Sequence, residues 1–391
     1  MPHTPVPPVL LGDEPGSFRR GVLAERHPAI IRQVREAFPY DAEVRRALDE
    51  LAVNCTRGAL EPLPDEAHDL DRWRAWGLDG HLGTSWYDVP WLWSESYFYR
   101  QLLQAVGYFG PGVWQGVDPF RPMKLAELES AETEAELAAL DDLAERSATE
   151  RGRALLHGSL WGNRADLGFR LSDAGAEERA AVSGLVADDS DALWAALKDA
   201  TVLCLVADNA GRELVPDLLF LAHLLTEHQI ERAVLHVKPY PYYVSDATFD
   251  DVLDAVRALV AAPGAAGEFG RRLWAALSDG TLVVRAHPFS ASPLPYADMP
   301  DDLRADFAGA SVTVFKGDLN YRRLVGDRLW APTTPFADVT AYFPGVVAAL
   351  RTLKSDVITG LSAETEAALT ASEGQGWRIG GTRALIQVRG V

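Results

Sequence analysis

The feature that most narrowly limits the fold of this chain is the alternation of strand-like and helical segments after about residue 195. Short apolar runs occur at residues 201–207, 232–238, 281–287 and 311–317, and helical patterns separate them. Strands that alternate with helices in sequence form mostly parallel sheets covered by helices on both faces. The sequence therefore predicts an α/β fold with a mostly parallel sheet.

The pattern of apolar residues divides the chain into three parts. Residues 1–18 are rich in proline and are expected to form an extended arm. Residues 19–195 carry apolar positions at helical spacing, which predicts a mainly helical region. Residues 196–391 contain the alternating segments and are expected to form the α/β domain.

The charge balance limits the partners of the chain. With 56 acidic and 37 basic residues the net charge is −19, which argues against nucleic acid or an anionic membrane as a partner. No stretch approaches the roughly 18 consecutive apolar residues of a membrane span, and no secretory pattern is seen near residue 1, so the cytoplasm is the expected location. The sequence carries no indication of oligomeric state.

Polar residues follow the apolar runs at the points where strands of the predicted sheet would end. Asp208 and Asn209 follow the first run, Ser245 and Asp246 lie in the loop after the second, and the segment 316–322 follows a later one. Ligands of open parallel sheets bind outside the carboxyl ends of the strands. We therefore expect these groups to converge at one edge of the sheet.

Asp208, Asn209 and Asp246 offer only oxygen ligands, two carboxylates and an amide carbonyl. Such ligands suit Mg²⁺ or Mn²⁺, which often share their remaining positions with a substrate phosphate. Asp and Asn are also preferred helix N-caps, and both segments precede helical patterns. Spacing alone leaves a metal site and helix capping as open alternatives.

The segment 316–322 and the segment 351–356 supply cations. The first holds Lys316, Asp318, Asn320, Tyr321 and Arg322, which could grip a phosphorylated polyol or could form a solvated turn. The second, "RTLKSD", is expected to be helical and to place its Arg and its Lys on one face, which could equally be an ordinary basic surface.

Two further residues are left open between a structural role and the site. His287 follows another strand and could face the same edge of the sheet, although a structural histidine is the more common case. Glu95 could be an ion-pair partner or could face the site.

Several well-known catalytic motifs are absent. No GxGxxG follows a strand, and GxxxxGK[ST], HExxH and GxSxG do not occur. A phosphatase that works through an aspartyl phosphate would want a second acid two residues after its nucleophile, but Ala210 stands there after Asp208.

Four motifs, in this order and at similar separations, resemble a known family. The motifs "ADNAGRELVPDL", "YVSDATFDD", "FKGDLNYRRLVGDR" and "RTLK" are similar to those of the damage-control phosphatases once grouped as domain of unknown function 89, and of their subfamily III with its RTxK motif. The likeness extends to residues 16–34, 90–100 and 159–167, so it covers nearly the whole chain. It implies a helical N-terminal region, a Rossmann-like α/β/α sandwich and metal-dependent hydrolysis of sugar phosphates or related metabolites.

The resemblance also implies roles for single residues. It implies that Asp208, Asn209 and Asp246 bind a divalent cation, commonly Mn²⁺, Ni²⁺, Co²⁺ or Mg²⁺. It further implies that a small phosphate ester, the substrate, contacts Asp208, Asn209, Asp318, Leu319, Asn320, Tyr321, Arg322 and Lys354. We add Lys316 to this set as a cation that could bind phosphate. Asp208, Asn209, Asp246 and Asp318 are the expected catalytic groups.

The expected reaction is therefore hydrolysis of a phosphomonoester such as fructose 1-phosphate or fructose 6-phosphate, and the expected site lies within residues 196–391. Two alternatives remain. One is transfer of a methyl group from S-adenosylmethionine to protein glutamates, an activity attributed to a member of the same subfamily. The other is a non-catalytic protein that binds a metabolite.

Overall fold

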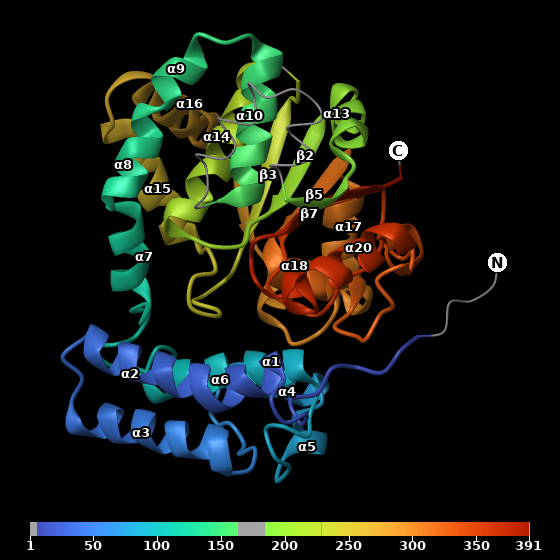
Figure 1. The fold of residues 1–391 in the computed structure, drawn as a ribbon. Coiled ribbons are helices and arrows are strands. Elements are labelled where there is room, and N and C mark those ends of the chain that lie inside the picture. Colours follow the sequence, from blue (N-terminus) through green and yellow to red (C-terminus); the bar gives the residue numbers. More distant parts are fainter. Residues whose placement is uncertain (1–5, 163–183, 228, 391) are drawn as a thin grey trace.

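The computed structural model describes residues 6–162, 184–227 and 229–390 (Figure 1). Within them a sheet of seven strands has the order β1-β7-β6-β5-β2-β3-β4. The strands are β1 (Leu185–Asp188), β2 (Val202–Val206), β3 (Arg232–Val237), β4 (Leu282–Ala286), β5 (Val312–Lys316), β6 (Val346–Thr352) and β7 (Ala384–Arg389).

The sheet is mostly parallel. All neighbours from β6 across to β4 pair in parallel, whereas β7 runs antiparallel to β6. Strand β1 pairs in parallel with β7 at the edge. The predicted α/β/α sandwich with a mostly parallel sheet is confirmed.

Helices cover both faces of the sheet, and Figure 1 shows α10, α14 and α16 on one side and α17, α18 and α20 on the other. The first face carries α7 (Arg121–Leu128), α8 (Ala131–Ala138), α9 (Leu140–Ala144), α10 (Ala148–Trp161), α13 (Ser190–Lys198), α14 (Leu214–Thr226), α15 (Phe249–Ala261) and α16 (Gly264–Asp279). The second carries α17 (Asp301–Ala308), α18 (Gly317–Val325), α19 (Phe336–Val339) and α20 (Ala363–Glu373). Short 3₁₀ turns, η2 (Gly211–Glu213), η3 (Pro288–Ala291), η4 (Tyr296–Asp298) and η5 (Gly376–Arg378), join several of these elements.

The strands are apolar on both faces because both faces are covered. In β2, Leu203 and Leu205 belong to the core under α14, whereas Cys204 and Val206 belong to the core under α17 and α18. Successive side chains of a strand point to opposite faces, so a strand covered on both sides reads as a continuous apolar run. This is why residues 201–207 are recognisable as a strand from sequence.

The N-terminal region forms a separate helical layer with its own core. Its elements are α1 (Phe18–Gly21), the π-helix η1 (Val22–Arg26), α2 (His27–Ala37), α3 (Ala42–Arg57), α4 (Leu70–Ala75), α5 (Leu78–His81) and α6 (Trp91–Ala105). Figure 1 shows this layer beyond one end of the strands, below the sheet in that view. Tyr243 and Val244, in the loop after β3, pack against it.

Two observations bear on the predicted boundaries. Strand β1 precedes residue 196, and α7, α9 and α10 contribute buried residues to the core of the sheet. The predicted division of the chain into 1–18, 19–195 and 196–391 stays a prediction.

The segment 351–356 is not helical, so that prediction was wrong. Arg351 and Thr352 end strand β6, and Lys354 lies in the loop that follows. The run from Val346 to Leu350 is rich in alanine, but it lies between β5 and β7 and pairs with both. Tertiary pairing therefore overrides the helical propensity of this stretch. The segment after Lys316 is likewise the helix α18 and not a solvated turn.

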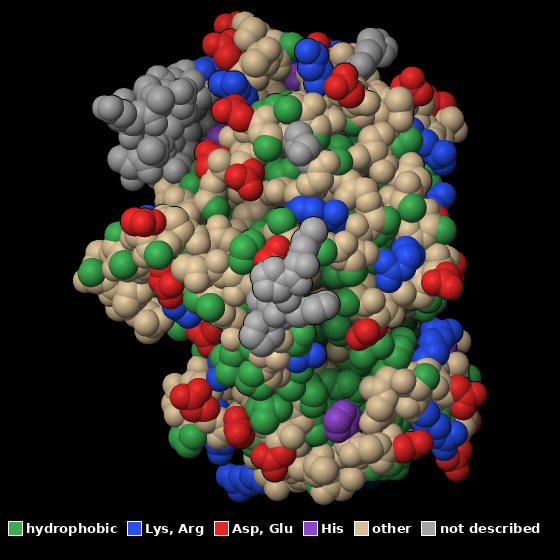
Figure 2. All heavy atoms as spheres, turned by 90° about the vertical axis from the view of Figure 1, so that its right-hand side faces the viewer, with side chains coloured by type: hydrophobic (Ala, Val, Ile, Leu, Met, Phe, Trp, Pro, Cys, Tyr) green, Lys and Arg blue, Asp and Glu red, His purple; other side chains and the backbone are tan. Residues whose placement is uncertain are grey.

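Figure 2 shows acidic and basic side chains interspersed on one face, with hydrophobic side chains gathered in its lower part, over the N-terminal helical region. No helix in the described ranges has the length and apolar character needed to cross a membrane.

Candidate functional site

The order of strands reverses between β2 and β5, because β3 follows on one side of β2 and β5 lies on the other. Ligand sites in open α/β sheets lie at such switch points. A cavity of about 230 Å³ lies here, at the carboxyl ends of β2, β5 and β6. It is lined by Ser159, Leu160, Trp161, Gly162, Asp208, Asn209, Glu213, Asp217, Lys316, Gly317, Leu350, Thr352, Lys354 and Gly381.

Asp208 follows the end of β2 and lies directly against Gly317, at the start of α18. A Cβ atom at Gly317 would come 1.8 Å from Asp208 Oδ2, and the φ of Gly317 is +84°. Both the backbone angle and the space therefore require glycine at this position. The turn between β5 and α18 can approach the carboxylate only because no side chain stands between them.

The amide of Asn209 is held at both ends. Its Nδ2 donates to Glu213 Oε2 at 2.7 Å, and its Oδ1 accepts from Ser245 Oγ at 2.8 Å. These contacts fix the direction in which the amide oxygen and nitrogen face.

The loop that carries Asp246 runs beside the end of β2. Ala247 N donates to Asp208 O at 2.8 Å, and Ala210 N donates to Ser245 O at 2.6 Å. The side chain of Asp246 is buried, with only 3% of the residue exposed. The first two strand ends singled out in the sequence are therefore adjacent.

The capping alternative is wrong for all three oxygen-bearing residues. The 3₁₀ turn η2 and helix α14, which follow Asp208 and Asn209, both begin without a side-chain cap. Helix α15, which follows Asp246, has Thr248 as its N-cap, and Asp251 completes a capping box with it. The oxygens of the three residues are thus not committed to helix ends.

A buried lysine that follows β3 pairs with Asp246. Lys238 Nζ lies 3.3 Å from Asp246 Oδ2 and donates to Ser290 O at 3.2 Å. Asp246 Oδ2 nevertheless has no hydrogen-bond partner among the described residues. Lys238 and Asp246 therefore form an ion pair without a hydrogen bond.

Burial and neighbouring charges shift the pKa values of the carboxyl groups of Asp208 and Asp246. Burial raises the pKa of Asp208 well above its ordinary value, and the negative charges of Asp246 and Glu213 raise it further. Burial also raises the pKa of Asp246, although Lys238 opposes this. Burial lowers the pKa of Lys238, although Asp246 opposes this in turn. The two acids thus lie close together, and the cations around them, among them Lys238 and Lys354, only partly offset the effect of burial.

This arrangement fits a divalent cation. The described residues contain no group of three or more His, Cys, Asp or Glu side chains placed to hold a metal ion. The expected set has only two such residues, Asp208 and Asp246, and its third donor is the amide oxygen of Asn209. All three donors are hard oxygens, Asp246 Oδ2 has an ion-pair contact with Lys238 but no hydrogen bond within the described residues, and a bound cation would relieve the repulsion between the acids. Asp208 and Asn209 line the cavity, whereas Asp246 is not among its lining residues.

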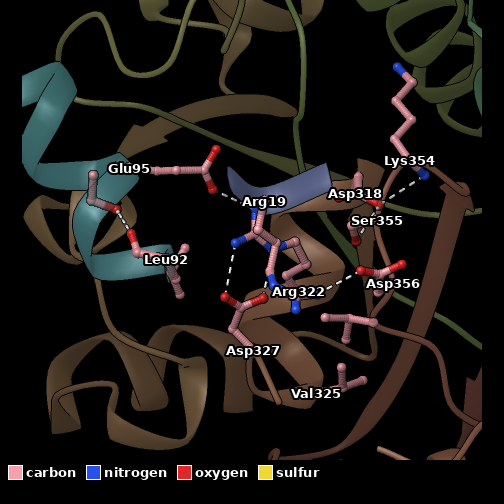
Figure 3. Close-up of polar contacts among 12 residues, drawn as sticks. Arg19, Leu92, Glu95, Asp318, Arg322, Val325, Asp327, Lys354, Ser355 and Asp356 are labelled. Carbon is pink, nitrogen blue, oxygen red and sulfur yellow. Dashed lines mark hydrogen bonds and ion pairs between the residues drawn. The ribbon is translucent and has the colours of Figure 1, made fainter. Parts of the chain in front are cut away.

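Lys354 lines the same cavity as Asp208 and Asn209. Its backbone N–H donates to Asp318 Oδ1 at 3.2 Å, and Figure 3 shows its side chain extending away from Asp318. Burial lowers the pKa of Lys354, but the negative charges of Glu213, Asp208 and Asp318 raise it more, so the net shift is upward. The ammonium group is therefore charged at neutral pH.

Asp318 shapes the loop that carries Lys354. Its Oδ1 lies 2.7 Å from Arg351 Nη2 and accepts from Ser355 Oγ at 3.1 Å. Burial raises the pKa of Asp318, but the guanidinium groups of Arg351 and Arg322 lower it more, and the net shift is downward. Asp318 thus stays ionised. It is not among the residues that line the cavity.

Lys316 lines the cavity but already has partners. Its Nζ lies 3.1 Å from Asp217 Oδ1 and donates to the carbonyl of Ser159. Ser159 Oγ also donates to Asp217 Oδ1, at 2.5 Å. The charge of Lys316 is therefore balanced by a buried acid within the same cavity.

Three of the predicted substrate contacts lie in the interior: Leu319, Asn320 and Tyr321. Leu319 packs with Leu92 and Tyr242 in a small apolar cluster. Asn320 and Tyr321 are both fully buried. None of Leu319, Asn320 and Tyr321 lines the described cavity.

The polar atoms of Asn320 and Tyr321 bond within the protein. Asn320 Nδ2 donates to Ala207 O at 2.8 Å, and Tyr321 Oη donates to Gln387 Oε1 at 3.0 Å. In the structure the side chains of Asn320 and Tyr321 support the strands around the cavity. Their predicted contacts with substrate stay predictions.

Arg322 belongs to a buried ion-pair network drawn in Figure 3. Its guanidinium group lies 2.8 Å from Glu95 Oε2 and 2.7 Å from Asp327 Oδ1, and 3.6 Å above the ring of Trp91. Burial raises the pKa of Glu95, although Arg322 opposes this. Of the two roles left open for Glu95, the structure shows the ion pair.

His287 lies beyond edge strand β4, where it has a structural role. Its Nδ1 accepts from Phe289 N at 3.0 Å and so caps the turn η3, and its Nε2 lies 3.2 Å from Asp302 Oδ2. It does not line the cavity.

The sequence reasoning missed Glu213 and Lys238. Glu213 lies four residues after Asn209, which is the spacing of side-chain partners on a helical turn. Lys238 directly follows β3, so the same attention to strand ends that selected Asp208 would have selected it. In the motif at 159–167, residues 163–167 lie outside the described part of the chain.

The sequence of the chain is similar to those of known proteins. The family model described as the damage-control phosphatase ARMT1-like domain matches residues 22–369. The chain is 28% identical to the damage-control phosphatase ARMT1 of Rattus norvegicus, over 98% of this chain and 99% of that protein. It is 29% identical to the protein of the same name from Danio rerio, over 83% of this chain and 80% of that protein.

One solved structure is also similar. A crystal structure of a DUF89 family protein from Pyrococcus horikoshii matches with a TM-score of 0.48 and 14% identity, and the match covers 92% of this chain and 96% of that one.

Proposed function

This chain belongs to the damage-control phosphatase ARMT1-like family, and we propose that it is a divalent-metal-dependent phosphatase of sugar phosphates or related small metabolites. One juxtaposition supports the chemistry: Asp208, Asn209 and the charged Lys354 line one cavity at the switch point of the sheet. Hydrolysis of a phosphate ester depends mainly on positioning and on stabilisation of negative charge. A carboxylate-rich cation site beside a charged ammonium group can supply both.

In this proposal Asp208, Asp246 and the amide oxygen of Asn209 hold the cation. When bound, an ion such as Mn²⁺, Ni²⁺, Co²⁺ or Mg²⁺ neutralises phosphate charge and lowers the pKa of a water molecule. Glu213 accepts from Asn209 Nδ2, so the amide nitrogen is occupied, whereas Asn209 Oδ1 accepts one hydrogen bond from Ser245 Oγ and keeps a second lone pair for the cation.

The chain's own groups orient the reactants. Lys354 Nζ binds a phosphoryl oxygen and holds the phosphorus in reach of a water molecule. A carboxylate oxygen of Asp208 accepts a proton from that water as the water oxygen attacks phosphorus. The bond between phosphorus and the sugar oxygen breaks, the leaving oxygen takes up a proton from solvent, and the products are inorganic phosphate and the free sugar.

The size of the cavity favours a small substrate. About 230 Å³ is less than the ~300–1,000 Å³ of pockets that hold drug-sized ligands. Leu160, Trp161 and Leu350 form its apolar lining, and the side chains of Glu213 and Thr352 add polar groups that could face sugar hydroxyls. Fructose 1-phosphate and fructose 6-phosphate are the substrates we propose to test first.

The test is phosphate release from these two esters by metal-free protein, with and without added Mn²⁺, Ni²⁺, Co²⁺ or Mg²⁺. We expect release only with metal, and we expect Asp208→Ala to lower it by about 100-fold or more. Asp191→Ala is the matched control, because the Asp191 carboxylate is 98% exposed and lies outside the cavity. Wild-type release by the Asp208→Ala variant would contradict the mechanism.

The same preparation distinguishes the alternatives. Transfer of a labelled methyl group from S-adenosylmethionine that survives a chelator would support the methyltransferase. Tight Mn²⁺ binding without turnover of any phosphate ester would support a metabolite-binding protein.

A further inference from the structure

A buried lysine of helix α7 holds the main chain of the loop that carries Asp246. Lys124 Nζ donates to Asp246 O at 3.1 Å, and it pairs with Asp118 Oδ2 and Asp251 Oδ2, both at 2.9 Å. Its side chain is only 4% exposed. All three donors of the ammonium group therefore have partners, and one of them is the backbone of a proposed metal ligand.

The same helix also lies against the loop after β2. Gly211 has a φ of +63°, and a Cβ atom there would come 3.1 Å from Lys124 O and 3.0 Å from Glu127 Oε2. Helix α7 thus contacts both loops that supply the proposed cation ligands, one by close packing and the other through the Lys124 ammonium group.

A buried arginine near the N-terminal arm holds the loop that carries Lys354. Arg19 Nη1 lies 2.7 Å from Asp356 Oδ2, as drawn in Figure 3, and its Nε donates to Leu11 O at 2.8 Å. Its Nη2 also pairs with Glu14, at 3.1 Å, so the guanidinium group is anchored in the arm.

The loop is therefore held at Lys354 and Ser355 by Asp318, and at Asp356 by Arg19. Asp318 accepts from Lys354 N and from Ser355 Oγ, and Arg19 forms the ion pair with Asp356. A side chain that must place its ammonium group on a phosphoryl oxygen needs such a fixed backbone, because a displacement of about 1 Å can cost as much as 100-fold in rate.

We propose that Lys124 and Arg19 are positioning residues for the proposed phosphatase site: Lys124 sets Asp246 for cation binding, and Arg19 sets Lys354 for phosphate binding. Helix α7, through Lys124, and helix α1, through Arg19, then take part in two separate steps of ligand binding. The proposal rests on the proposed function and predicts that the two residues affect different constants.

The first test is titration of Mn²⁺ into metal-free protein by calorimetry. Lys124→Met is expected to raise the Kd for Mn²⁺ by about 10-fold or more, because loss of a group that orients a metal ligand typically costs 10–100-fold in affinity. The KM for fructose 1-phosphate at saturating Mn²⁺ is expected to stay within about twofold. Lys124→Arg keeps the charge between Asp118 and Asp251 and is expected to restore part of the affinity.

The second test measures phosphate binding. Arg19→Ala is expected to raise both the KM for fructose 1-phosphate and the Kd of inorganic phosphate for the Mn²⁺-loaded protein by about tenfold, with an unchanged Kd for Mn²⁺. Arg19→Lys should restore part of this loss. Asp356→Asn should reproduce the effect of Arg19→Ala, and the double variant should add little to either, because both changes break one ion pair.

Two neighbouring arginines serve as controls. Arg121 lies on α7 and pairs with Asp254 at 2.7 Å, and Arg20 stacks 4.5 Å above the ring of Tyr87. Arg121→Ala and Arg20→Ala remove cations from the same elements without touching either loop, and both Kd values should stay within about twofold of the wild type.

A purely structural role would give a different result. Removal of Lys124 leaves buried acids unpaired and lowers the free energy of unfolding, so urea unfolding is measured for every variant. The proposal is overturned if Lys124→Met and Arg19→Ala lower stability but leave both Kd values unchanged, or if either variant changes both Kd values equally. If the wild type binds Mn²⁺ and phosphate but hydrolyses no ester, the proposed function fails and the two titrations still decide the positioning roles.

Discussion

At the scale of single residues, the site depends on the absence of a side chain as much as on the groups present. The Asp208 carboxylate occupies the space that a Cβ atom of Gly317 would need. The acid can therefore lie at the switch point, beside the start of α18, only with glycine at position 317. The sequence "KGD" at residues 316–318 contains this glycine without showing why it is required.

The prediction for Gly317→Ala follows from this contact. The methyl group would displace Asp208, and we expect phosphate release to fall by about 100-fold or more. The positive φ adds about 1–3 kcal/mol of lost stability. Phosphate release is measured with Mn²⁺, and the free energy of unfolding is measured in urea.

Gly280→Ala is the matched control for this change. Gly280 has a φ of +81°, close to that of Gly317, but a Cβ atom there would meet nothing within 4 Å. The control variant should lose similar stability and keep its activity. Equal loss of activity in both variants would show that strain, and not contact with Asp208, explains the effect.

At the scale of secondary structure elements, a stacked pair of rings joins helices α2 and α6. The ring of His27 lies 3.7 Å from that of Phe98, with an interplanar angle of 5°. Neither ring nitrogen of His27 has a hydrogen-bond partner among the described residues. Burial, with a smaller contribution from Arg26, lowers the pKa of His27 from 6.5 to about 3.

This lowered pKa predicts an acid-sensitive helix contact. Between about pH 6.5 and pH 3 the unfolded chain binds a proton that the folded chain excludes, so stability falls as the pH falls through this window. Between about pH 7.5 and pH 5 the wild type should lose about 2 kcal/mol more than His27→Phe. Urea unfolding at the two pH values measures this, and parallel losses in the two proteins would contradict it.

The strand β6 shows where element prediction from sequence failed. Its alanines favour a helix, and Arg351 and Lys354 have a spacing that suits one helical face. In the structure Arg351 lies in the strand, fully buried against Asp318, and only Lys354 reaches the cavity. The two cations of the RTxK motif therefore have separate roles, which the prediction of one shared helical face did not distinguish.

At the scale of the whole molecule, segments that precede residue 196 contribute to both cores of the sheet. The core on one face of the sheet includes Leu155, Leu156 and Leu160 of α10, and the core on the other includes Leu10 and Trp91. Strand β1 also precedes residue 196. The fold of the sheet therefore depends on segments from well before the predicted boundary.

A chain that begins at residue 196 should consequently fail to fold. It would lack β1 and α10 and would expose the apolar surface that they cover. We expect no cooperative urea transition by circular dichroism, whereas the full chain under the same conditions should show one. Cooperative, native-like unfolding of residues 196–391 would support the boundary predicted from sequence.

The sequence by itself determined the α/β class and the strand ends that carry Asp208, Asn209 and Asp246, because apolar periodicity and the residues that interrupt it are local signals. Tertiary structure alone decided which partner each charged group takes. Lys316 pairs with Asp217, and Arg322 with Glu95, 227 residues away in sequence. No local pattern encodes such pairs, since they form only when the packing of the sheet brings distant segments together and burial makes an unpaired charge too costly to keep.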